Sequence, residues 1–247
     1  MTRTEVNRKA VVLGVGPERG LGGALCRRFA EEGHHVFVSG RTAGKLDSVA
    51  SGIVRRGGSA TPVVCDATRE DQVVGLFDRI LETGQGELDL AVYNVGNSTP
   101  GRIREMSASR FEEAWRRLCF GGFLFGRECT RRMLPAGGTL IFTGASASLR
   151  GRSGFGAFNS GKSALRVLAQ AMAKEYGPEG LHVGHVIVDG GIAGDRQFDR
   201  LDGEPDDETL RRLVSLEALA DSYWHLHGQK PSGWTFEMDM RTALENW

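Results

Sequence analysis

The sequence predicts an α/β fold: a doubly wound, mostly parallel sheet of seven strands with helices on both faces. Short, continuous apolar runs such as residues 10–15 are typical of strands buried on both faces of a parallel sheet. These runs alternate with longer stretches in which apolar residues recur at helical spacing. A glycine-rich turn joins the first run to the first helical stretch, so the chain opens like a Rossmann-type βαβ unit.

Seven runs predict the strands, and six longer stretches predict the main helices. The strands are expected at residues 10–15, 35–39, 60–65, 88–93, 139–142, 182–188 and about 234–240. The helices are expected at residues 21–32, 46–56, after Asp66 to about 81, 108–133 (interrupted at Gly121-Gly122), 158 to about 176, and 216–227. No linker, repeat or low-complexity tract divides the chain. We therefore expect residues 1–247 to form a single dinucleotide-binding domain.

One polar segment breaks this alternation. Residues 193–213 are rich in charged side chains and have no regular periodicity. Because long insertions at the carboxyl edge of a sheet are usually functional, we expect a substrate lid at about 193–215. A disordered surface loop is the alternative.

Composition excludes several classes of function. Basic and acidic residues both number 31, so net charge favours neither nucleic acid nor a membrane as partner. No stretch reaches the ~18 apolar residues that span a bilayer, and charges near the N-terminus break any signal-peptide pattern. The four cysteines lack metal-ligand or redox-pair spacing, so we expect buried, reduced thiols and no metal site. These features predict a soluble, cytoplasmic protein with a small-molecule partner.

The glycine-rich turn contains Gly16, Gly20 and Gly22, and Leu21 begins the helix that follows. Glycines there let backbone N–H groups approach a pyrophosphate at the helix N-terminus. Similar turns occur without a ligand, but the flanking strand and helix favour a nucleotide site.

Basic residues near this turn indicate which nucleotide binds. The second strand ends at Ser39-Gly40-Arg41, where an acidic residue would bind the ribose 2′-hydroxyl of NAD(H). Arginine instead suits a 2′-phosphate, and Arg19 in the glycine turn is expected to converge on the same ribose. We therefore expect NADP(H), with NADPH preferred over NADH. For Arg41, a solvated loop charge is the alternative.

Further candidates follow the later strands. Asp66 and Ala67 come after the third strand, where an adenine would lie, although Asp66 alternatively caps the next helix. Tyr93 ends the fourth strand and is expected to pack in the core. Phe158 and Lys162 lie four residues apart at a helix start, so both side chains point to the same space.

In their order these pieces resemble the short-chain dehydrogenase/reductase family over residues 10–192. Lys162 matches the lysine of the family's Tyr-x-x-x-Lys motif, and the resemblance implies that it bridges the nicotinamide ribose hydroxyls. Family members are commonly oligomeric, which implies a homodimer or homotetramer. The resemblance implies a cofactor site made by Gly16, Arg19, Gly20, Leu21, Gly22, Arg41, Asp66, Ala67, Asn94, Gly96, Lys162, Gly190 and Ile192.

The departures from the family pattern fall on proton transfer. Phe158 stands where the family has its tyrosine, and it has no hydroxyl. The family's serine position corresponds to Ala145, with Ser146 beside it. A positioned general acid contributes roughly 10²–10⁴-fold to the rate, so the usual mechanism should be impaired. We expect the catalytic site around Lys162, Ser146 and Phe158. The alternative proton donors are Ser148, Asp189 and a water held by Lys162.

Three functions are compatible with these residues. The first is an NADP(H)-dependent oxidoreductase that acts on a carbonyl or alcohol with a non-standard proton donor. The alternatives are a regulatory protein that binds NADP(H) without turnover and a non-redox isomerase, lyase or cyclase. Four aromatic residues predict a fairly apolar substrate pocket: Trp115, Phe120, Phe155 and Phe158.

Overall fold

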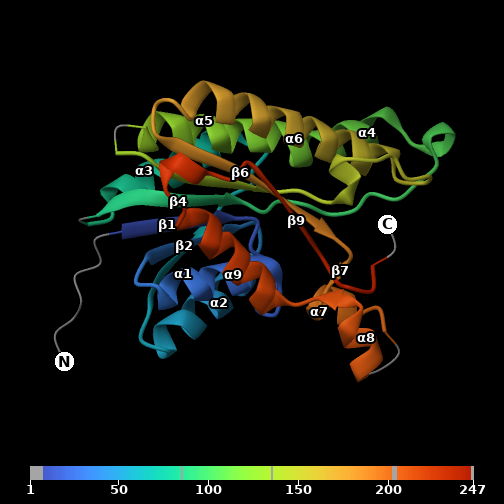
Figure 1. Ribbon diagram of the computed structural model, residues 1–247, viewed down its shortest axis with the longest axis horizontal. Helices are drawn as coiled ribbons and strands as arrows, with labels where there is room; N and C mark the ends of the chain where they lie inside the picture. The colour runs from blue at the N-terminus through green and yellow to red at the C-terminus, as the bar shows by residue number, and fades with distance from the viewer. Residues whose placement is uncertain (1–7, 85, 135, 202–204, 246–247) are drawn as a thin grey trace.

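The computed structural model describes residues 8–84, 86–134, 136–201 and 205–245. Within these residues, the centre is a seven-stranded sheet in the order β3-β2-β1-β4-β5-β6-β9, with parallel pairings throughout (Figure 1). Its strands are β1 Arg8–Leu13, β2 His35–Gly40, β3 Ser59–Val64, β4 Glu87–Tyr93, β5 Gly138–Thr143, β6 Leu181–Asp189 and β9 Glu237–Arg241. The order reverses between β1 and β4, which opens a crevice at the carboxyl edge. The fold class predicted from the sequence is confirmed.

Helices cover both faces of this sheet, as Figure 1 shows. Helices α1, α2 and α9 lie on one face, and α3, α4, α5 and α6 lie on the other. Their bounds are α1 Leu21–Glu31, α2 Ala43–Arg55, α3 Glu70–Glu82, α4 Ala108–Trp115, α5 Gly121–Met133, α6 Gly156–Tyr176 and α9 Leu216–His227. In the described ranges, no helix combines the length and the hydropathy needed to cross a bilayer.

Alternating side chains of the strands make two cores, one under each helical layer. On β1, Ala10 and Val12 belong to the core shared with α1 and α9. Val11 and Leu13 belong to the core shared with α3, α5 and α6. Because successive strand residues point to opposite faces, a strand covered on both sides needs apolar residues throughout. The strands therefore stand out in the sequence as continuous apolar runs.

The long helix expected over residues 108–133 is divided differently. Helix α4 passes into a π-helical segment, Arg116–Phe120, and α5 begins at Gly121. Within the wider turn, the carbonyl of Arg117 accepts a hydrogen bond from the hydroxyl of Tyr93 at 2.6 Å. Tyr93 is fully buried, as expected. The predicted interruption at the two glycines is wrong, because the irregular turn precedes them.

The segment from residue 193 to 213, predicted to be irregular, contains regular elements. They are α7 Asp195–Phe198 and α8 Asp207–Arg211, and the segment ends in β8 Leu213–Val214, which pairs in parallel with β7 Gly191–Ile192 just before it. Asp206 caps α8 by accepting a hydrogen bond from the backbone N–H of Thr209 at 2.8 Å. Helices this short have no apolar periodicity to detect. Residues 202–204 of the expected lid lie outside the described residues.

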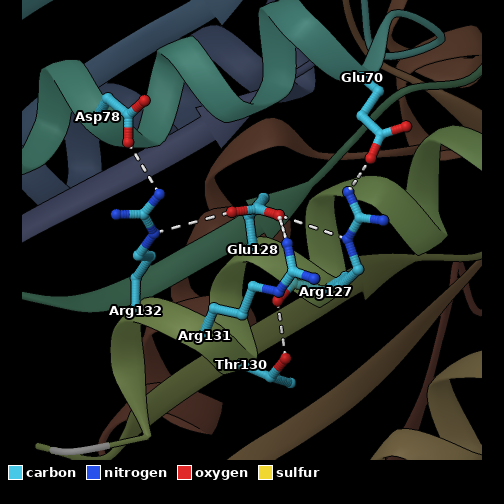
Figure 2. A network of polar contacts seen from close by, with 7 residues as sticks. All are labelled: Glu70, Asp78, Arg127, Glu128, Thr130, Arg131 and Arg132. Atoms are coloured by element: carbon cyan, nitrogen blue, oxygen red, sulfur yellow. Dashed lines mark hydrogen bonds and ion pairs between the residues drawn. The ribbon is translucent and has the colours of Figure 1, made fainter.

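A polar network joins α5 to α3 (Figure 2). Glu128 of α5 is buried, and Arg127 and Arg132 lie 3.4 and 3.7 Å from its carboxylate. The same two arginines reach α3, where they contact Glu70 at 2.6 Å and Asp78 at 2.8 Å. A buried carboxylate is costly without a partner, and here the arginines of its own helix neutralise it. These contacts account for the arginine-rich end of α5.

Candidate functional site

A cleft of about 1000 Å³ opens at the carboxyl edge of the sheet, between the turns that follow β1, β4, β5 and β6. We call residues 14–22 with 94–97 the β1 side of this cleft, and residues 143–162 the β5 side. Twelve of the residues expected from the sequence line it: Gly16, Arg19, Gly20, Leu21, Gly22, Asn94, Gly96, Ser146, Phe158, Lys162, Gly190 and Ile192. Three others that the structure describes, Arg41, Asp66 and Ala67, do not line it.

On the β1 side, the glycine turn packs closely against the turn after β4. Gly14 has a φ of 108°, and a Cβ there would lie 2.6 Å from backbone atoms of Asn94. The Nδ2 of Asn94 donates a hydrogen bond to the Gly14 carbonyl at 3.2 Å. Both the dihedral angle and the lack of space require glycine at position 14. Sequence reasoning missed this residue because it belongs to the apolar run of the first strand.

Gly16, in contrast, borders open space. A Cβ at Gly16 would meet no atom within 4 Å. Helix α1 begins at Leu21 with no side-chain cap on Gly20 and no acidic residue in its first turn. Its first backbone N–H groups are therefore left to another acceptor, and the helix dipole favours an anion there. This unobstructed helix start suits a pyrophosphate.

Arg19 connects the glycine turn to α7. Its guanidinium lies 3.7 Å from the carboxylate of Asp195 and 5.0 Å above the ring centre of Phe198. The Arg19 carbonyl also accepts the N–H of Asp195 at 2.8 Å. Arg41 is exposed just before α2, and among the described residues no contact joins it to Arg19. The sequence did not indicate that the Arg19 side chain contacts other residues of the same chain.

Asp66 and Ala67 follow β3. The Asp66 carboxylate accepts hydrogen bonds from the backbone N–H and the hydroxyl of Thr68, both at 2.9 Å. Helix α3 begins only at Glu70, with Arg69 at its N-cap, so the alternative that Asp66 caps this helix is wrong. Ala67 is buried.

Lys162 lines the cleft although it is only 3% exposed. Its Nζ donates a hydrogen bond to the Thr143 carbonyl at 2.6 Å, and the Thr143 hydroxyl shares a hydrogen bond with the hydroxyl of Tyr223 at 2.8 Å. Burial lowers the pKa of Lys162 from 10.5 to about 8. An ammonium group carries three N–H donors, so two remain after the bond to Thr143. Lys162 is therefore a mostly protonated cation at neutral pH with donors to spare.

Phe158 and Ser146 border the cleft on its β5 side. Both are partly exposed, so both are accessible to a bound molecule. Ser148 is buried, and its Oγ accepts a hydrogen bond from the N–H of Ala145 at 3.3 Å. It is not among the cleft-lining residues, which removes it as an alternative proton donor.

Asp189, another alternative donor, is also committed elsewhere. Its buried carboxylate lies 3.2 Å from a guanidinium nitrogen of Arg150 and 3.3 Å from one of Arg241. A carboxylate in contact with two guanidinium groups is engaged as their hydrogen-bond and ion-pair partner. Asp189 therefore holds arginines in place and does not serve as the acid.

Sequence reasoning missed several polar residues of the cleft. They are Arg150, Arg152, Asn159, Arg196 and Arg200. Asn159 follows Phe158, and its Nδ2 donates a hydrogen bond to the Arg150 carbonyl. Its Oδ1 is buried and has no hydrogen-bond partner among the described residues. The only signal in the sequence was the density of arginine in the segments 150–152 and 196–200.

The expectation of an apolar pocket is wrong in part. Phe155 and Phe158 do line the cleft. Trp115 and Phe120 do not: their rings stack on each other with centroids 6.3 Å apart, and Trp115 is 38% exposed. The long helix turns these two side chains away from the cleft.

One group of residues with metal-ligating atoms lies at the amino edge of the sheet, away from the cleft. His34, Asp89 and His227 bring their ligand atoms within 4.8 Å of one another. His34 Nε2 and the Asp89 carboxylate are 2.8 Å apart, which is an ordinary hydrogen bond. These contacts are explained without an ion.

Comparison with known proteins identifies the family. The family model of the short chain dehydrogenases matches residues 10–197. The chain is 32% identical over 194 residues to the uncharacterized oxidoreductase YuxG of Bacillus subtilis (strain 168), a match that covers 77% of this chain and 28% of YuxG. The chain thus spans less than a third of that relative's length.

Solved structures share the same fold. A short-chain dehydrogenase from Rhodopseudomonas palustris is 34% identical, with a TM-score of 0.80 over 95% of this chain and 98% of that one. An alcohol dehydrogenase from the archaeon Thermococcus sibiricus, complexed with 5-hydroxy-NADP, has a TM-score of 0.84 at 20% identity over 97% and 99% of the two chains. Because the family model covers most of the sequence, the chain belongs to the short-chain dehydrogenase/reductase family.

Proposed function

We propose that this protein is an NADP(H)-dependent oxidoreductase that interconverts a carbonyl and an alcohol on a small molecule. The observation that carries the proposal is the cleft itself. It brings the open glycine turn, the buried cation Lys162 and the residues after β6 to one space at the carboxyl edge of the sheet. That is where ligands of doubly wound sheets bind.

The residues on the β1 side fit a dinucleotide. Gly16 leaves open space beside the uncapped start of α1, which suits the pyrophosphate. No acidic residue ends β2, and Arg41 follows that strand directly. We propose that Arg41 and Arg19 bind the 2′-phosphate of NADP(H), and that Asp66 and Ala67 border the adenine. The family fold holds an NADP derivative in the Thermococcus sibiricus enzyme.

A bound nicotinamide supplies or accepts the hydride. The chain must then hold the reactants and supply one proton to the developing alkoxide. Phe158 has no hydroxyl, Ser148 does not line the cleft, and Asp189 is paired with Arg150 and Arg241. Lys162 retains two N–H donors and a pKa of about 8, so we propose that it delivers the proton, either directly or through a water. We propose that Ser146, which lines the cleft, hydrogen-bonds the substrate oxygen.

The segment from 193 to 215 is proposed to be the substrate lid. The Asp195 N–H bonds the Arg19 carbonyl at 2.8 Å, and an Arg196 nitrogen lies 3.5 Å from the Gly96 carbonyl. Both contacts span the cleft to the turns of the β1 side. A lid anchored there excludes water from the reacting groups.

We also propose that two or four copies assemble through the face of α4 and α5. Three aromatic side chains on these helices, Phe111, Trp115 and Phe123, are between 38% and 41% exposed. Apolar side chains gathered on one face are typical of subunit interfaces. Light scattering on the purified protein tests this, and a monomer at micromolar concentration contradicts it.

Cofactor titration tests the main proposal. Nicotinamide fluorescence is followed as NADPH and NADH are added, and carbonyl compounds are then screened by the loss of nicotinamide absorbance. NADPH should bind more tightly, and Arg41→Ala should weaken NADPH much more than NADH. Arg55→Ala, which removes an exposed arginine from the other end of α2, serves as the matched control. Failure to bind either nucleotide, or binding without turnover of any carbonyl compound, contradicts the proposal.

A further inference from the structure

We propose that the substrate is an anion: a small carbonyl compound bearing a carboxylate or a phosphate ester, bound on the β5 side of the cleft. This inference rests on the proposed oxidoreductase function and names its substrate class. Its basis is an excess of arginine among the residues that line the cleft, in a chain whose basic and acidic residues both number 31.

Arginines dominate the charge of the cleft. Five arginines line it, against two acidic residues, Asp189 and Glu245. Arg19 is paired with Asp195, and Arg150 is paired with Asp189. The other three have no acidic partner among the described residues: Arg152, Arg196 and Arg200. The cleft therefore offers guanidinium groups that no carboxylate of the described chain neutralises.

Arg152 is the arginine best placed for a substrate. It lies between β5 and α6, and its guanidinium sits 4.9 Å above the ring centre of Phe155. Phe158, beside the reacting space, comes one helical turn later. The start of α1, which suits a pyrophosphate, follows β1, and β4 separates β1 from β5 in the sheet. Arg152 therefore belongs to a different turn from the one that suits the pyrophosphate, and it is exposed in the cleft lining, where an anion on the substrate can reach it.

Next to Arg152, Arg150 and Asn159 add a polar surface that hydrogen bonds hold in place. Asp189 holds Arg150 through both carboxylate oxygens, at 3.3 and 3.2 Å. Asn159 is 7% exposed, and its Nδ2 donates a hydrogen bond to the Arg150 carbonyl. Its Oδ1 is buried and has no hydrogen-bond partner among the described residues, and Asn159 is one of the residues that line the cleft. The β5 side therefore combines the guanidinium of Arg152 with polar groups held by hydrogen bonds, which suits an anionic substrate.

An apolar ketone would fit this wall poorly. It would cover guanidinium groups without accepting hydrogen bonds from them, and burying unpaired polar groups costs free energy. A carboxylate or phosphate oxygen pair matches the fork of a guanidinium and can accept two hydrogen bonds from it. Phe155 and Phe158 then contact only the carbon skeleton.

Matched pairs of carbonyl compounds test the proposal. The acids acetoacetate and 2-oxoglutarate are compared with their methyl esters, and dihydroxyacetone phosphate with dihydroxyacetone. Each is assayed for turnover with NADPH and for binding to the NADPH-loaded protein by calorimetry. We expect one or more anions to bind about tenfold or more tightly than the neutral partner, and the advantage should shrink as salt is added. The acid pairs and the phosphate pair identify which anion is preferred.

Arg152→Met provides the decisive variant, because methionine keeps contact with Phe155 but removes the charge. It should abolish the preference for the anion, so that the anion and its neutral partner bind with similar affinity. Arg55→Met, an exposed arginine on α2, is the control and should change neither affinity. Equal binding of anion and neutral partner, or an anion preference that survives in Arg152→Met, overturns the inference. Loss of NADPH binding itself would instead contradict the proposed function, so the two failures are distinguishable.

Discussion

The two sides of the cleft are built by different means. The β1 side is made of backbone: Gly14 touches Asn94, and Gly16 exposes the uncapped start of α1. The β5 side is made of side chains, with Lys162 held by a carbonyl and Arg150 held by a buried carboxylate. A site made of backbone tolerates few sequences, whereas a site made of side chains changes its chemistry with one substitution. Phe158 illustrates this, because its side chain lines the cleft and carries no hydroxyl.

The largest effect on turnover is expected from a substitution on the β5 side, at Lys162. Lys162→Met removes the proposed proton donor, so turnover should fall roughly 10²–10⁴-fold. Steady-state kinetics with NADPH measure this loss. Lys174→Met, on the exposed end of the same helix, is the control. Activity within a few fold of the native value would exclude Lys162 as the donor, provided that the variant keeps its melting temperature.

Two alanine substitutions separate the structural glycine of the β1 side from the one that borders the ligand. Gly14→Ala places a Cβ 2.6 Å from the Asn94 backbone at a positive φ, which should cost on the order of 3 kcal/mol of folding free energy. Gly16→Ala meets no atom within 4 Å and should leave stability within about 0.5 kcal/mol, while weakening NADPH binding. Urea unfolding and nucleotide titration measure the two effects. If Gly16→Ala binds NADPH normally, the pyrophosphate does not lie at this turn.

Phe158→Tyr sharpens the role of the β5 side. It adds a hydroxyl on the helical face shared with Lys162, so the reduction rate should rise by about 10- to 100-fold. Phe155→Tyr, which also lines the cleft, is the matched control and should have little effect. An unchanged rate in Phe158→Tyr would mean that proton transfer is not limiting or that position 158 is misaligned with the substrate oxygen.

The smallest effect is a pH dependence carried by Lys162, whose pKa is lowered from 10.5 to about 8 in the folded protein. Carbonyl reduction should decline above about pH 8 as the ammonium loses its proton. Between about pH 8 and 10.5 the unfolded chain binds more protons at this lysine, so its contribution to stability should increase with pH. Denaturant titrations across this range should show that the native protein gains stability relative to Lys162→Met as pH rises. A constant difference would contradict the lowered pKa.

Much of the fold was predictable because its signals are local. Buried parallel strands must be apolar at every position, so runs such as residues 10–15 mark them directly. Helix α9 was predicted with its observed bounds, Leu216–His227, because its pattern is periodic. The short helices α7 and α8 were missed because caps and loop contacts stabilise them, and these leave no repeated apolar pattern.

The same distinction between local and long-range features applies to the candidate site. The sequence by itself determined the glycine turn, the Phe158–Lys162 pair and the absence of an acid after β2, because each lies within a few residues. Only the tertiary structure decided which charges are paired: Asp189 binds Arg150 from 39 residues away, and Arg19 meets Asp195 across the cleft. It also showed which arginines have no acidic partner among the described residues. Charge pairing depends on distances between elements that are remote in the chain, and no local pattern encodes those distances.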